Sequence, residues 1–271
     1  MPQFAIELPL TTLRLFVGSR TDLGSVRRVN EDSLVATPPV FLVADGMGGH
    51  ARGDAASQAV ARVFSSAFPI DKPTTVDAVT SALQLANDEV RALSELAEEG
   101  PALSGTTVTG VALVATGSGK GDDSARDRHG LYEWMVFNVG DSRVYVWDGD
   151  DLTQISVDHS AVQELVDAGL ISAEDAELHP DRNVITRAIG ASARVDADVW
   201  LMPLAGTRTF VLCSDGLTKE LADDSIARIL RDADERGEAD RVADLLVEAA
   251  LDAGGRDNVT VVVVRTANAT L

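Results

Sequence analysis

Short apolar runs separated by polar, glycine-rich segments are the main pattern of this chain, and six of the runs have the length of strands. They are rich in Val, Phe, Thr and Trp, which favour a pleated, buried surface. The predicted strands cover residues 40–44, 107–115, 134–139, 144–147, 209–213 and 259–264. The last of these is the longest strongly apolar run, and it is far too short to span a bilayer.

Apolar residues also recur at helical spacing, and they predict three long helices and a shorter one. The first two cover residues 56–67 and 76–96, and the third covers residues 242–253 and stops at Gly254-Gly255. The shorter helix covers residues 161–168 and ends at Gly169.

The order of these elements predicts the α+β class, because two helices come early, strands fill the middle and one long helix comes late. We expect antiparallel sheets covered by helices. Residues 1–10 look like an N-terminal extension and residues 11–271 like a single domain. Within it, residues 117–130 read as a polar surface loop, and residues 158–200 as an excursion from the sheet without a clear strand, here called the flap.

Composition and charge narrow the classes of function. The chain has 271 residues, of which 45% are hydrophobic and 24% charged, as expected for a folded domain with a full core. Its formal charge of −20 argues against nucleic acid as a general partner and against direct membrane insertion. Cys213 is the single cysteine and the N-terminus lacks a signal-peptide pattern, so we expect a reducing, cytoplasmic location.

Aspartates at strand ends are the most informative feature. Asp45 and Asp215 follow predicted strands and precede glycines, while Asp141 and Asp257 stand just before predicted strands. Carboxylates clustered at a sheet rim repel one another unless cations bind, and hard oxygen ligands select Mg²⁺ or Mn²⁺. The Gly46 carbonyl is open to a metal as well. A single Asp-Gly pair is usually only a turn, but four such sites together favour a metal centre.

A basic pair at Arg27-Arg28 stands out in an acidic chain. The planar guanidinium of an arginine suits a phosphate dianion. Taken alone, an arginine such as Arg27 is more often a solvated surface residue.

Eight segments in order resemble the metal-dependent Ser/Thr protein phosphatases (PPM family, type 2C) in their compact bacterial form. The likeness runs over about residues 17–264. The segments are Arg27-x-x-Asn30-Glu31-Asp32, Asp45-Gly46-Met47-Gly48-Gly49-His50, Ser104-Gly105-Thr106-Thr107, Val139-Gly140-Asp141-Ser142-Arg143, Asp158-His159-Ser160, Thr186-Arg187-Ala188-Ile189-Gly190, Ser214-Asp215-Gly216-Leu217 and Gly255-Arg256-Asp257-Asn258.

This resemblance implies a β-sandwich of two antiparallel sheets flanked by α-helices, in four αββα layers, with a binuclear Mg²⁺ or Mn²⁺ site at one end. In such a site Asp45 would bridge both ions and the Gly46 carbonyl would bind one of them. Asp215 and Asp257 would bind the other ion. Asp141 matches the residue that bacterial members use for a third, weaker ion.

The resemblance also implies the activity, which is hydrolysis of phosphoserine and phosphothreonine in proteins by a water that bridges the two metals. Arg27 would hold the substrate phosphate, and Glu31 or Asp32 would lie near the metals. The partners implied are phosphorylated proteins, together with a Ser/Thr kinase that shares these substrates.

One position departs from the family, and two other functions stay open. Animal members carry a histidine, proposed as the acid for the leaving group, where this chain has Met47. His50 or a metal-bound water could take its place, although His50 is more simply read as a turn residue. The chain could instead be a phosphatase of small phosphoesters, or a catalytically weak regulatory domain that binds metal. A regulatory domain would predict a lost ligand, and none of the core ligands is missing.

Overall fold

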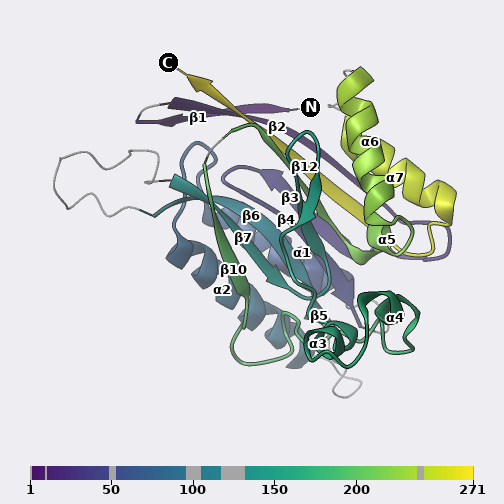
Figure 1. Cartoon of the computed structure of the whole chain (residues 1–271). Helices are drawn as coiled ribbons and strands as arrows, with labels where there is room; N and C mark the ends of the chain where they lie inside the picture. Colours follow the sequence, from purple (N-terminus) through teal and green to yellow (C-terminus); the bar gives the residue numbers. More distant parts are fainter. Residues whose placement is uncertain are drawn as a thin grey trace.

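Two antiparallel sheets pack face to face in the computed structural model of this chain (Figure 1). It describes residues 2–9, 11–48, 53–95, 105–116, 132–204, 206–236 and 241–270. The first sheet has the order β1 (Gln3–Leu8), β2 (Thr11–Asp22), β12 (Val259–Thr270), β11 (Arg208–Cys213), β8 (Arg143–Trp147) and β9 (Leu152–Gln154). The second has the order β10 (Asp198–Pro203), β7 (Tyr132–Val139), β6 (Val108–Ala115), β4 (Val40–Met47) and β3 (Asp32–Thr37), with β5 (Gly105–Thr106) beside β4.

Helices form the two outer layers, as Figure 1 shows. Helices α1 (Gly53–Ala67) and α2 (Val76–Glu95) cover the second sheet. Helices α6 (Asp223–Arg236) and α7 (Val242–Ala253) cover the first, next to the short α5 (Asp215–Thr218). The predicted α+β sandwich with four layers is confirmed.

Strand β4 begins with a continuous run of apolar residues because both of its faces are buried. Phe41 and Val43 point into the core between the two sheets, whereas Leu42 and Ala44 point into the core under α1 and α2. Because side chains alternate along a strand, a strand buried on both faces needs apolar residues at every position. Cys213 follows the same rule in β11, where it is fully buried under α6 and α7.

The N-terminal residues are more than an appended piece. Residues 3–8 form the edge strand β1, which pairs with β2 over its whole length. Ile6 and Leu8 are buried in the core between the sheets. The sequence pattern missed β1, β2, β3 and β9, none of which is buried along its whole length.

The flap is largely as expected, with one difference at its end. It contains the short helices α3 (Ala161–Asp167) and α4 (Ala173–Leu178). The expectation of no strand is wrong for its last residues, because β10 begins at Asp198 and pairs with β7. The predicted loop at 117–130 lies outside the described residues. Among the described residues, no helix is both long and apolar enough to cross a membrane.

Candidate metal centre

The ends of β3 and β4 bring the first two carboxylates together. Asp32 and Asp45 are directly opposite each other in the antiparallel pair of strands. The backbone of Asp45 is fixed by Thr107, whose hydroxyl accepts a hydrogen bond from the Asp45 amide at 3.1 Å. Ser214, at the end of β11, donates to Asp32 Oδ2 at 2.8 Å. The second sheet is thus tied to the first at the site.

A close backbone approach places Asp215 beside Asp257. A Cβ atom added at Gly216 would overlap the carbonyl oxygen of Asn258. Only glycine therefore lets the start of α5 lie against the turn that carries Asp257. The two aspartates come from segments far apart in the sequence, and the charge of Asp215 is close enough to raise the pKa of the buried Asp45 further.

Gly46 has a similar structural role. A Cβ atom added there would overlap the carbonyl of Gly53 and crowd the backbone oxygen of Glu31. This packing seats the first turn of α1 against the end of β4. Gly46 therefore stands next to Asp45 for a steric reason, in addition to any contact of its carbonyl with a metal.

The carboxylates of Asp32, Asp45, Asp141, Asp215 and Asp257 are here called the cluster, and burial together with neighbouring charges raises the pKa values of Asp32, Asp45, Asp141 and Asp215. Burial, and then the charges of the other four, raise the pKa of Asp45 well above its usual range. Burial, with Asp215 and Asp257, raises the pKa of Asp32 to about 6. Burial, with Asp215 and Asp158, raises the pKa of Asp141 to about 7. The cluster therefore lacks positive charge.

Two side chains supply part of that charge. Lys219 lies against the carboxylate of Asp215 and 3.2 Å from Asp257 Oδ2. Arg27 makes two contacts with Asp257, through Nε at 2.8 Å and an Nη atom at 2.9 Å. With these cations in place, no group of three or more acidic, His or Cys side chains in the described ranges is arranged to hold one metal ion.

Unpartnered oxygens show that the cluster nevertheless fits a divalent ion. Asp32, Asp141 and Asp215 each have a buried Oδ1 atom with no hydrogen-bond partner. Buried oxygens of this kind are costly unless a cation or donor satisfies them. The donors are oxygens, the ligands that Mg²⁺ and Mn²⁺ prefer.

The flap is connected to the Asp141 turn by hydrogen bonds. The Gly140 amide donates to His159 Nδ1 at 3.2 Å, and the His159 amide donates to the Gly140 carbonyl at 2.9 Å. His159 Nε2 lies 3.3 Å from an oxygen of Asp198. Arg143 adds a salt bridge of 2.7 Å to Asp158. The contacts between the flap and this turn therefore run through Asp158 and His159.

Of the two acidic residues expected near the metals, only Asp32 belongs to the cluster. Glu31 directs its carboxylate toward Gly53 at the start of α1. Met47 packs beside Gly105. Gly49, His50 and Ser104 lie outside the described residues.

No role was predicted from the sequence for three residues that organise the site, namely Ser214, Lys219 and Asn258. The buried Asn258 accepts from the Glu31 amide at 2.9 Å and donates to the carbonyls of Leu23 and Val29 at 2.9 and 3.1 Å. It thereby fixes the segment that carries Arg27 next to Asp257. Their positions in the sequence could have indicated these roles, because each residue lies within four residues of a predicted ligand.

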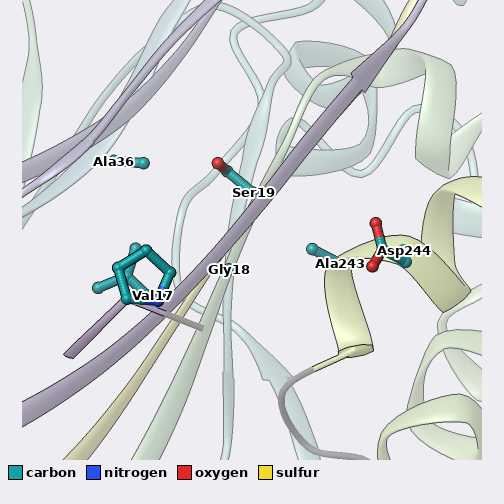
Figure 2. A pocket seen from close by; sticks show the side chains of 7 residues that line it. Val17, Gly18, Ser19, Ala36, Ala243 and Asp244 are labelled. Carbon is teal, nitrogen blue, oxygen red and sulfur yellow. The ribbon is translucent and has the colours of Figure 1, made fainter.

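The molecule also has a cavity of about 350 Å³ that shares no residue with the cluster. Figure 2 shows its lining, which comes from Pro2, the strands β2 and β3, and the start of α7. Its one carboxylate, that of Asp244, lies 3.7 Å from Arg20. The cavity therefore offers little chemistry, and the acidic cluster is the stronger candidate for the functional site.

Comparisons with known proteins give matches over most of the chain. A family described as Protein phosphatase 2C matches residues 28–249. The serine/threonine phosphatase stp of Listeria innocua is 35% identical over 255 residues, which cover 90% of this chain and 93% of that protein.

Solved structures give the same result. The serine/threonine phosphatase PstP/Ppp of Mycobacterium tuberculosis superposes with a TM-score of 0.77 at 34% identity, over 92% of this chain and 97% of that one. The catalytic domain of PstP in complex with two manganese ions gives a TM-score of 0.75 at 32% identity, over 94% and 99% of the two chains.

Proposed function

The chain belongs to the protein phosphatase 2C family, and on that premise we propose that its acidic cluster holds divalent metal ions and hydrolyses phosphoserine and phosphothreonine in proteins. The observation that carries the proposal is the convergence of Asp45, Asp215 and Asp257, in a cluster where buried carboxylate oxygens have no partner. All three residues stand at the positions that the family resemblance assigns to metal ligands.

The residues that would hold two ions come from both sheets. Asp45 contributes its carboxylate from the end of β4, with the Gly46 carbonyl beside it. Asp215 and Asp257 contribute theirs from the start of α5 and the turn before β12. Asp32 adds a further carboxylate next to these ligands, and its hydrogen bond with Ser214 links the two sheets at the site.

Divalent ions, when bound, supply Lewis acidity, which makes hydroxide available from water near neutral pH and offsets charge on a phosphoryl group. Arg27 binds and orients the substrate phosphate. The Arg27 side chain pairs with Asp257 and is about half exposed, with 48% of its surface accessible. Its guanidinium group can therefore contact the phosphate group of an incoming substrate.

A third, weaker ion at Asp141 is part of the proposal. Asp141 is buried, its Oδ1 atom has no partner, and the charge of Asp215 raises its pKa. An ion shared by Asp141 and Asp215 would satisfy both carboxylates. Mn²⁺ and Mg²⁺ both suit such oxygen ligands.

The substrates we propose are phosphorylated proteins, with a Ser/Thr kinase that phosphorylates the same sites. We also propose that the chain acts in the cytoplasm, since its single cysteine is buried in a core and offers no disulfide.

The experiment compares phosphate release from a phosphothreonine peptide and from p-nitrophenyl phosphate, with Mn²⁺ and with excess chelator. We expect release from the peptide that depends fully on the metal. Equal turnover in chelator would exclude the proposed chemistry. Metal-dependent turnover of the small ester alone would make the chain a phosphatase of small phosphoesters.

A further inference from the structure

The ammonium group of Lys219 contacts the acidic cluster, although Lys219 is not one of the predicted ligands. It is the residue that caps the C-terminus of α5, and its amide donates to the Asp215 carbonyl at 2.8 Å. One helical turn separates it from Asp215, so the two side chains lie on the same side of α5. The local backbone therefore directs its ammonium group to the cluster.

The ammonium group contacts the two residues that would share one metal ion. Lys219 Nζ pairs with Asp215 Oδ2 and lies 3.2 Å from Asp257 Oδ2. Asp215 Oδ1, by contrast, is buried and has no partner. A single positive charge thus bridges the two carboxylates and leaves one of their oxygens unsatisfied.

A divalent ion and this ammonium group compete for the same oxygens. An ion held by Asp215 and Asp257 needs lone pairs that Lys219 now occupies, and two cations at such a distance repel each other. The Lys219 side chain is 38% accessible, so it has room to move toward solvent when an ion enters. Arg27 differs, because it contacts Asp257 alone.

We propose that Lys219 is a tethered counter-ion of the metal site, which bridges Asp215 and Asp257 in the metal-free protein, leaves them when the ion enters, and so lowers the affinity of the site for metal. This inference rests on the proposed function, since it assumes that these two residues are ligands. It assigns Lys219 a role in setting the metal concentration at which the protein becomes loaded.

The first experiment measures Mn²⁺ binding by calorimetry for the wild type, Lys219→Met and Lys72→Met. Lys72 is exposed, so the second variant removes the same charge outside the site. We expect Lys219→Met to lower the Kd for Mn²⁺ by about tenfold, within the range common for coupled sites, and Lys72→Met to leave it within twofold. Without metal, Lys219→Met should also melt roughly 2–4 °C lower than the wild type.

The second experiment needs no variant. The metal-free and Mn²⁺-loaded wild type are treated with an amine-acetylating reagent, and modification of Lys219 is measured by mass spectrometry relative to Lys72. We expect Lys219 to become several times more reactive in the loaded protein. A Kd unchanged in Lys219→Met, or equal labelling with and without Mn²⁺, would overturn the role of Lys219, whereas a wild type that binds no Mn²⁺ would instead overturn the metal site itself.

Discussion

Arg27 contacts both carboxylate oxygens of Asp257, with Nε 2.8 Å from Oδ1 and Nη2 2.9 Å from Oδ2, although the two residues are 230 positions apart in the chain. The residue predicted to bind phosphate therefore lies on a residue predicted to bind metal. Burial opposes the charged form of Arg27, but the contact with Asp257 outweighs it and raises the pKa of the guanidinium. Arg27 is thus a fixed positive charge at the accessible side of the cluster.

Replacing Arg27 with alanine should weaken phosphate binding and slow turnover. We expect Arg27→Ala to raise KM and lower kcat for a phosphothreonine peptide, with a loss in kcat/KM of about 1.5–3 kcal/mol, as for a charged hydrogen bond. Arg28→Ala is the matched control, because Arg28 is exposed beside it. A large effect of Arg28→Ala with a normal Arg27→Ala would show that the phosphate contact is assigned one residue too early.

Gly216→Ala should damage both folding and metal binding. The added methyl group would overlap the backbone oxygen of Asn258, which cannot move without displacing Asp257. Overpacking of this kind costs about 1–3 kcal/mol, so thermal melting should show a clear loss. Gly149→Ala is the control, since an added Cβ atom would meet nothing within 4 Å there. This control substitution costs only the backbone strain of a positive φ angle. Equal melting curves for the two variants would contradict the steric role of Gly216.

Asp141→Ala should separate metal binding from turnover. Asp45, Asp215 and Asp257 stay in place, so tight binding of two ions should persist. Turnover of phosphopeptide should fall by roughly tenfold or more if an ion at Asp141 contributes to catalysis. Metal stoichiometry and rate are measured on the same preparation. Unchanged turnover at low millimolar Mn²⁺ would leave Asp141 as a structural turn residue.

His159→Ala should release the flap from the Asp141 turn. The variant removes the acceptor for the Gly140 amide and the neighbour of Asp198, which should cost about 1–3 kcal/mol for the buried groups left unpaired. Hydrogen exchange should become faster at Gly140 and in the flap. His179→Ala is the control, because the contacts of His179 are with its own neighbours in the flap. Similar exchange in both variants would rule out His159 as the anchor.

The sequence predicted the parts of the fold that have a one-sided or continuous apolar pattern. Strands such as β4 are buried on both faces, and the helices α1 and α7 have a wide apolar stripe. Both patterns can be recognised in the sequence. Helix α6 was missed because it fully buries only Ile226, Leu230 and Ala233, and most of its other residues are polar. The edge strand β1 was missed because it is short and buries only Ile6 and Leu8.

The sequence predicted the aspartates of the site but not the roles of the side chains that position them. Asp45, Asp141 and Asp215 were visible because an aspartate at a strand end is unusual in a buried setting. Lys219 and Asn258 were not, because their roles depend on contacts with residues distant in the chain, which no local pattern records. That Asp45 bridges two ions and that Asp141 holds a third remain predictions.

The central claim, that the cluster is a metal-dependent catalytic site, is tested most directly by Asp45→Asn. Bound Mn²⁺ and the rate of phosphate release from a phosphothreonine peptide are measured together, with Asp71→Asn as an exposed control. We predict that Asp45→Asn loses bound Mn²⁺ and several orders of magnitude in rate, while Asp71→Asn matches the wild type in both. Full activity of Asp45→Asn, or of the metal-depleted wild type, would contradict the account.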